Sequence, residues 1–386
     1  MSSLTTAPEA LAEARRAPLE NIANRVADAG QRLDVRTDRY SARGVLWEVT
    51  GLKRCRSCGR WSIREDGAVE ARQKGSAVGF AGLASCGSVW ACPVCNSKIQ
   101  ARRRLEVGAA LSWALGSGGG AAFGAYTLRH HQGSDPDRLW RSLTKCWQAV
   151  SRDFTVRRLR AAMGYLGTIR ANECTYGGNG WHPHLHPVLL FARLVSATEV
   201  LALHAAQFRA WQSAAARLGV DAPAMVAQDL HVVAGDRADG ELAEYFTKTT
   251  FTLSSEAVGW EMTSTQTKAR SRGEGRTPWE LLRSVRDNGD ADDLDLWRQW
   301  EAFSKGKRAL TWSRGLRRAA GLDAEKTDED VAAEVIGTAD DVLFTILEWG
   351  SFRAHPAWGA ELLNVVERGG KSAGLVWCDE RGVETR

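Results

Sequence analysis

The stretch GWHPHLHPVLLF, residues 180–191, places three histidines at alternating positions and then runs into four apolar residues. Alternate residues of a β-strand lie on one face, so His182, His184 and His186 share a face if the strand includes all three. The two prolines of the stretch each remove a ladder donor, which suits an edge strand or a strand start. Two imidazoles about 6–7 Å apart can chelate one cation. We therefore expect His184 and His186 to be metal ligands.

The segments around the histidines predict the rest of the sheet. The loop GSGGG leads into AAFGAYTLRHH, which is typical of a strand. A helix is expected to begin at Asp135–Pro136, because apolar residues recur at helical spacing from Leu139 to Val150. YLGTIRANECTY and HLHPVLLF then form a strand pair across the turn GGNG. With the later helices and the strand DLHVVAG, this order predicts an α+β fold: an antiparallel sheet with helices on one face, in a split β-α-β arrangement.

Changes in composition divide the chain into five expected units. They are a weakly ordered leader (1–50), a Cys-rich zinc-binding module (51–112), the sheet domain (113–278), a basic helical extension (279–320) and an acidic α-rich C-terminal appendage (321–386).

Length and composition exclude several classes of protein. The chain has 386 residues, of which 44% are hydrophobic. It contains no run of about 18 apolar residues and no basic-then-apolar leader, so a membrane protein or an exported protein is not expected. The expected compartment is the cytoplasm. There, eight cysteines indicate a metal site more readily than disulfides.

The net charge of +5 is unevenly distributed. Residues 321–386 hold six basic and fourteen acidic side chains, whereas Lys98 to Arg170 hold thirteen basic and four acidic ones. A polyanionic partner would explain the basic region, although a solvated helix face would explain each basic run alone. Candidates to stack on unpaired bases are Trp90, Trp140 and Trp181, although most of the sixteen tryptophans are expected to be in the core.

Two CxxC pairs predict a structural zinc site. They are Cys55 with Cys58 and Cys92 with Cys95, and Cys86 is a fifth candidate for four places. Each CxxC turn offers two thiolates to one Zn²⁺, and two turns complete a tetrahedral site. Such a module could contact DNA through Lys98 and Arg102 to Arg104.

The histidine pattern has three functional interpretations. Alternating histidines with apolar spacers resemble the histidine-triad nucleotide hydrolases, which need no metal. A metallo-β-lactamase-type site would need an aspartate where Val188 stands. The HUH endonucleases carry His-hydrophobic-His on a strand and a tyrosine on a later helix.

A candidate tyrosine lies about sixty residues after the histidines. Tyr245 is in GELAEYFTKTTF, with Glu241 four residues before it and Lys248 three after. On a helix the three side chains share one face. A phenol can attack phosphorus, a carboxylate can take a proton, and an ammonium can hold phosphate charge.

Taken in order, these motifs resemble those of rolling-circle plasmid replication initiators, the single-tyrosine class of HUH endonucleases, in a form similar to those of actinobacterial plasmids. The matching pieces are FGAYTLRH, GWHPHLHPVLLF and ELAEYFTK, with CGSVWACPVCNSKI and LTWSRGLR also similar. The resemblance covers roughly residues 51–320 and makes 113–278 the expected HUH nickase domain.

The resemblance implies site-specific nicking of a plasmid's double-strand origin. Tyr245 would be the nucleophile, giving a 5′-phosphotyrosine and a free 3′-hydroxyl that primes synthesis, and Lys248 would hold phosphate charge. Glu241 would activate water at termination. His184 and His186 would hold Mg²⁺ or Mn²⁺, with Glu173 as the third ligand and His182 as its rival. Origin DNA, a host helicase and a host polymerase would be the partners.

Two other readings remain open. A relaxase or transposase of the same superfamily is the nearest enzyme, although relaxases usually place their tyrosine near the N-terminus. A zinc-dependent DNA-binding regulator without catalysis is the alternative from another class. It leaves the shared face of Glu241, Tyr245 and Lys248 unexplained.

Overall fold

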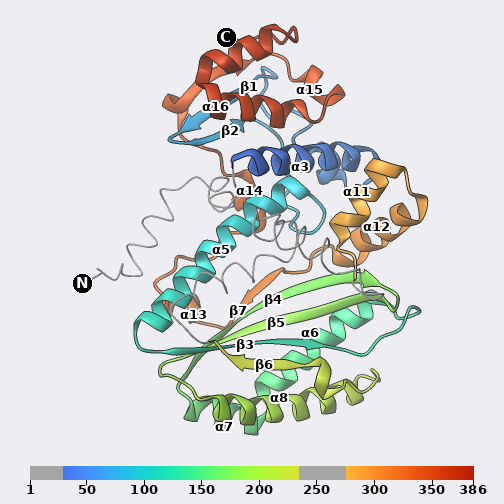
Figure 1. Ribbon diagram of the computed structural model, residues 1–386, viewed down its shortest axis with the longest axis vertical. Helices are drawn as coiled ribbons and strands as arrows, with labels where there is room; N and C mark the ends of the chain where they lie inside the picture. The colour runs from blue at the N-terminus through green and yellow to red at the C-terminus, as the bar shows by residue number, and fades with distance from the viewer. Residues whose placement is uncertain (1–28, 234–274) are drawn as a thin grey trace.

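A five-stranded antiparallel sheet is the centre of the larger part of the molecule, at the bottom of the view in Figure 1. The computed structural model describes residues 29–233 and 275–386. The strand order is β6-β3-β5-β4-β7. The bounds are β3 (Gly120–Thr127), β4 (Tyr165–Gly177), β5 (Gly180–Phe191), β6 (Asp229–Val232) and β7 (Leu310–Trp312). The region after residue 279, expected to be helical, therefore supplies one strand of this sheet.

The hairpin β4–β5 is the longest pairing of the sheet, and its register runs from Gly177↔Gly180 to Tyr165↔Phe191. It confirms the strand pair predicted across GGNG. Although it contains two prolines, β5 is an inner strand between β3 and β4. The ladder with β3 is interrupted between the pairs Phe123↔Val188 and Tyr126↔Leu185, where Pro187 lies. The missing donor of Pro187 therefore falls where β3 makes no pair.

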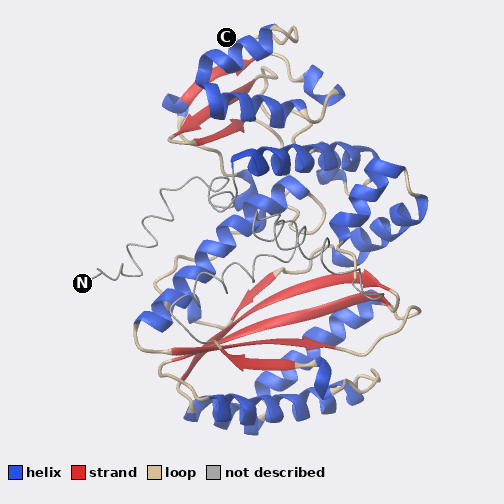
Figure 2. Cartoon of the chain, in the orientation of Figure 1, coloured by secondary structure: helices blue, strands red, loops and turns tan. Residues whose placement is uncertain are grey.

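Three helices cover one face of this sheet (Figure 2). They are α6 (Pro136–Arg152), α7 (Phe154–Ala162) and α8 (Ala197–Arg217). Helix α6 begins as predicted, since the carboxylate of Asp135 accepts a hydrogen bond from the backbone N–H of Asp137 and Pro136 is in the first turn. Its apolar stripe, Leu139, Leu143 and Val150 included, is buried against β3 and β5.

On the opposite face, the described helices cover one end only. The helices α5 (Pro93–Gly116) and α13 (Leu316–Ala319) pack there on Val188 and Leu190 of β5. The expectation of helices on a single face was therefore wrong in this part of the sheet. The apolar run at the end of β5 is buried on both faces, so it needs cover from both sides. The other end of this face carries the histidines.

A second, three-stranded sheet has the order β2-β1-β8. Strand β1 (Val69–Lys74) pairs antiparallel with β2 (Ala77–Ala81) and with β8 (Val342–Ile346). The Cys-rich segment and the acidic tail, expected as separate units, thus share one sheet. They also share one hydrophobic core with α3 (Ala29–Val49) and α16 (Trp358–Asp379).

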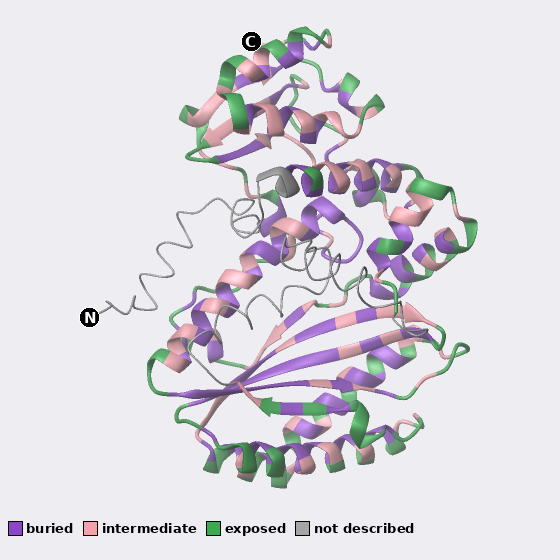
Figure 3. Ribbon diagram, viewed as in Figure 1, coloured by how far each residue is buried: buried purple, intermediate pink, exposed green. Residues whose placement is uncertain are grey.

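The remaining helical elements are short or lie around and between the two sheets. They are α4 (Lys53–Ser57), α11 (Pro278–Asn288), α12 (Ala291–Ser304), α14 (Asp328–Ala333), α15 (Gly350–Ala354) and two 3₁₀ turns (Met225–Ala227 and Ala339–Asp341). Tryptophans fill this region: Trp90 packs edge-on against Trp140 and Trp300 at 5.4 and 5.5 Å between ring centroids. Trp90, Trp140 and Trp181 are all buried, so they are core residues and offer no face to a base. Figure 3 shows long buried stretches along the strands of the five-stranded sheet as well. Within the described residues, no helix is long and apolar enough to cross a membrane.

Candidate metal centres

The hairpin β4–β5 brings a carboxylate and two imidazoles together. Glu173 on β4 is directly opposite His184 on β5, and His186 follows two residues later on the same face. Nε2 of His184 lies 2.7 Å from Oε2 of Glu173, and Nε2 of His186 lies 3.2 Å from the same oxygen. One donor atom from each residue falls within 4.8 Å of the others. The predicted third ligand and the predicted pair therefore form one cluster.

The backbone fixes the orientation of the first imidazole. Nδ1–H of His184 donates to the backbone carbonyl of His182 at 3.0 Å. Nε2 is therefore the nitrogen that faces the carboxylate, or a cation in its place. His186 is packed against Phe123, with parallel rings 5.7 Å apart. Both rings are held before any ligand binds.

The electrostatics of the cluster keep the carboxylate ionised. Burial by itself would raise the pKa of Glu173, but hydrogen bonds from His184 and His186 outweigh it and hold this pKa at about 2. Burial would lower the pKa of His184, and the hydrogen bond and charge of Glu173 raise it instead. An anionic oxygen and two imidazoles thus converge at neutral pH.

This donor set fits a divalent transition cation. Two imidazole nitrogens and one carboxylate oxygen suit Mn²⁺ or Zn²⁺, whereas Mg²⁺ prefers oxygen ligands alone. The three ligands found among the described residues come from one sheet face, which leaves other coordination positions for solvent or substrate. Of the two catalytic cations expected from sequence, Mn²⁺ is the better match to these side chains.

His182, the rival third ligand, is placed outside the cluster. Its Nε2 makes a short hydrogen bond with Oγ1 of Thr127, and its ring stacks on His130 at 4.7 Å. Burial, with the neighbouring charges of His184 and His130, lowers its pKa to about 3. His182 therefore contributes mainly the backbone carbonyl that orients His184. Sequence reasoning missed Thr127 and His130, although both belong to the quoted strand motif.

The three residues expected to carry the nucleophilic chemistry, Glu241, Tyr245 and Lys248, lie outside the described residues. The described chain before them ends just after β6, an edge strand that pairs with β3. In that pairing His231 is opposite Phe123, the residue whose ring packs on His186.

A second cluster consists of cysteines. Cys58, Cys86, Cys92 and Cys95 are buried, and their sulfur atoms lie within 4.8 Å of one another. The sulfur–sulfur distances are 3.4 Å for Cys58–Cys95 and 3.6 Å for both Cys58–Cys92 and Cys86–Cys95. Sulfurs at the corners of a tetrahedron around Zn²⁺, with Zn–S of about 2.3 Å, would be about 3.8 Å apart. The four thiols are thus close to the spacing that zinc requires.

The elements around this cluster explain which four cysteines come together. Cys58 ends α4, Cys92 and Cys95 begin α5, and Cys86 lies on the segment that follows β2. Cys55, favoured from its CxxC spacing, is buried next to Cys86 but is not one of the four. Hydrogen bonds from Cys58 and its neighbours lower the pKa of Cys95, whereas burial raises that of Cys92. All eight cysteines are free thiols.

Two curated proteins resemble the chain in sequence. One is named Protein rep, from Streptomyces lividans; it is 30% identical over 306 residues, which cover 64% of this chain and 66% of that protein. About a third of each chain lies outside this match. The other is a Neomycin resistance protein from Streptomyces cyanogenus, 34% identical over 150 residues, or 32% of this chain and 34% of that protein. No family model and no solved structure matches the chain.

Proposed function

We propose that this protein is a plasmid replication protein that nicks one strand of its origin in rolling-circle replication. The observation that carries the proposal is the convergence of Glu173, His184 and His186 on neighbouring strands. The similarity to Protein rep of Streptomyces lividans supports the role in plasmid replication. Origin DNA would be the substrate, and a host helicase and polymerase would act on the nicked product.

The proposed reaction is a transesterification. The phenol oxygen of Tyr245 attacks the scissile phosphorus, the bond from phosphorus to O3′ breaks, and the leaving O3′ takes up a proton. This gives a 5′-phosphotyrosine and a 3′-hydroxyl primer. Glu241 would accept the phenol proton and later activate water to release the strand, and Lys248 would neutralise phosphate charge.

The cluster of Glu173, His184 and His186 would hold the scissile phosphate next to this nucleophile. A divalent cation bound there would supply Lewis-acid polarisation of the phosphate. Glu173 is ionised at neutral pH and offers the anionic ligand, and His184 presents Nε2 because its Nδ1–H is bonded to the His182 carbonyl. A phenol with a pKa of about 10 is a weak nucleophile at neutral pH and needs such assistance.

A zinc-dependent DNA-binding regulator is the second candidate. The cluster of four buried thiols favours it, since that cluster requires no catalysis. The regulator would bind origin DNA without cutting it. A relaxase or transposase of the same superfamily would cut DNA by the same chemistry, but at a different kind of site.

Cleavage of labelled single-stranded origin oligonucleotides, with Mn²⁺ or with EDTA, distinguishes these candidates. We expect cleavage by the wild type only with the cation, and none by Tyr245→Phe. Tyr176→Phe is the matched control, because Tyr176 is a half-buried tyrosine on the β4–β5 hairpin. DNA binding without cleavage in any divalent metal would favour the regulator.

A further inference from the structure

A groove of about 840 Å³ lies between the cysteine cluster and the five-stranded sheet. Five segments line it: residues 51–55, residues 86–91, helix α5 at positions 99, 100 and 103, the loop 304–310 and the segment 325–329. Cys86 of the cluster is part of its lining.

One side of the groove carries cations without acidic partners. Lys53, Lys305 and Arg308 line the groove and are exposed. Within the described residues, none of the three has an ion pair, whereas their neighbours Arg54 and Lys307 each have one. An exposed cation with no internal partner is available to an external anion.

The loop that carries two of these cations is held in a defined shape. Gly306 adopts φ +74°, a conformation that favours glycine, and the N–H of Lys307 donates to the carbonyl of Ser304 at 3.1 Å. Nε1–H of Trp90 donates to the carbonyl of Lys307 at 2.6 Å. Lys305 is thus presented at the tip of a fixed turn, so little ordering is needed when an anion binds.

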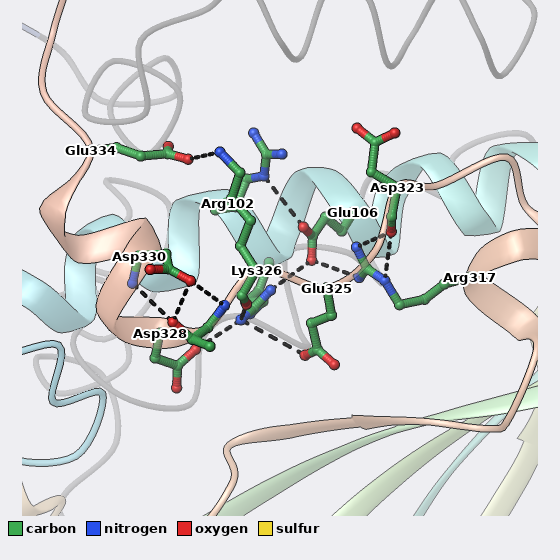
Figure 4. Close-up of polar contacts among 11 residues, drawn as sticks. Arg102, Glu106, Arg317, Asp323, Glu325, Lys326, Asp328, Asp330 and Glu334 are labelled. Atoms are coloured by element: carbon green, nitrogen blue, oxygen red, sulfur yellow. Dashed lines mark hydrogen bonds and ion pairs between the residues drawn. The ribbon is translucent and has the colours of Figure 1, made fainter.

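The other side of the groove is acidic, but its charges are already matched. Arg103 is within 2.9 Å of Asp328, 3.0 Å of Glu106 and 3.7 Å of Glu325. Arg317 adds a 2.9 Å contact with Glu106 (Figure 4). Because these carboxylates are paired with Arg103 and Arg317, they present little net negative charge to the groove.

The same network occupies basic side chains of α5 that would otherwise be available to DNA. Arg103 is buried, Arg102 pairs with Glu106 at 3.3 Å, and Nζ of Lys98 lies 3.5 Å from the carbonyl of Glu334. Three of the four basic residues that the sequence suggested for DNA binding therefore make contacts within the protein. The free cations of the neighbouring groove are better placed to bind DNA.

The groove is joined to the strand that carries Glu173. Asn172 on β4 donates from its backbone N–H to the carbonyl of Ala309 at 2.8 Å, and from Nδ2 to the carbonyl of Arg308 at 2.8 Å. Both acceptors belong to groove-lining residues. A polyanion bound along the loop 304–310 would thus lie against the strand of the metal cluster.

We propose that this groove binds the phosphodiester backbone of one DNA strand through Lys53, Lys305 and Arg308. The proposal rests on the proposed function, because that function makes DNA the substrate. A bounded groove of this volume admits a segment of a single strand, whereas a duplex needs a broad open face. The groove would guide the strand between the cysteine module and the nicking site.

The test compares two triple variants that lose the same charge. In the groove variant, Lys53, Lys305 and Arg308 are replaced by Ser; in the control, Arg152, Arg157 and Arg158 on the other face of the sheet are replaced by Ser, all three being exposed. Fluorescence anisotropy with a labelled single-stranded oligonucleotide is measured over a range of salt. Thermal unfolding and zinc content confirm that both variants are folded.

We expect the groove variant to bind the oligonucleotide at least tenfold more weakly than the wild type. The slope of log K against log salt concentration should fall in magnitude by about 2, because each of three lost phosphate contacts contributes about 0.7 for a single strand. The control should lose much less. Equal losses in the two variants, or unchanged binding in the groove variant, would overturn the proposal. A larger loss for duplex than for single-stranded DNA would overturn the assignment to one strand.

Failure of the groove and failure of the nickase give different results. If the wild type cleaves DNA and the groove variant binds like the wild type, only the groove proposal is wrong. If the wild type binds through the groove but never cleaves, the groove proposal stands and the nickase does not.

Discussion

Glu173 and His184 lie directly opposite each other on neighbouring strands, with 2.7 Å between Oε2 and Nε2. The pairing follows from the hairpin register, which the two-residue turn between Gly177 and Gly180 sets. A shift of one residue in this register would send the carboxylate to the other face. The metal cluster is therefore a direct product of strand pairing.

Replacing Glu173 by Gln should weaken Mn²⁺ binding by roughly 10–100-fold or more, because the only anionic ligand of the cluster becomes neutral. Isothermal titration calorimetry measures this change. Glu65→Gln is the control, since Glu65 is exposed and outside the cluster. Equal affinity in Glu173→Gln and the control would contradict the assignment of this ligand.

His182→Ala and His186→Ala should differ in their affinity for Mn²⁺. His186 offers a ring nitrogen to the cluster, whereas His182 is bonded through Nε2 to Thr127. We expect at least a tenfold loss of Mn²⁺ affinity in His186→Ala and less than threefold in His182→Ala. The reverse order would make His182 the ligand.

The cysteines give a matched pair of variants. Cys86→Ser should lose bound zinc, and Cys55→Ser should keep it, because only Cys86 belongs to the group of four close sulfurs. Zinc per chain, measured by atomic emission after dialysis, decides between them. Loss of zinc in Cys55→Ser with retention in Cys86→Ser would restore the two CxxC pairs as the site.

Glu106 should make stability depend on pH in acid. Burial by itself would raise its pKa, but Arg317 and Arg103 outweigh burial and lower it. Its contribution is therefore fully present above the unfolded value of about 4.3 and is lost as pH falls through the lowered folded pKa. Glu106→Gln should lower the free energy of unfolding at pH 7 by roughly 1–3 kcal/mol.

Urea unfolding between pH 3 and pH 7 tests this dependence. The wild type should lose more stability below pH 4.3 than Glu106→Gln, so the difference between them should shrink in acid. A difference that stays constant over the whole range would show that the charge of Glu106 is not the cause.

Local sequence patterns were enough for much of the sheet. The turn GGNG and the alternation around it predicted the β4–β5 hairpin, and Glu173, which the family resemblance implied as the third ligand, lies across that hairpin from His184. Asp135 and Pro136 marked the start of α6 correctly. These features depend on residues close together in the sequence.

Long-range contacts were not predictable in the same way. Strand β8 has five residues and pairs with β1, which lies about 270 positions earlier. Nothing in either segment identifies its partner, so the acidic tail was expected as a separate unit. Cys86 has no CxxC partner, and only the packing of the segment after β2 against α4 and α5 shows that its thiol is close to Cys58, Cys92 and Cys95.

The most direct measurement is the identification of a covalent protein–DNA adduct. Wild-type protein, incubated with a single-stranded origin oligonucleotide and Mn²⁺, is digested and analysed by mass spectrometry. We predict a nucleotide-linked peptide that contains Tyr245, absent with EDTA and strongly reduced in Glu173→Gln. An adduct on another residue, or cleavage without any adduct, would contradict tyrosyl transfer at this metal cluster.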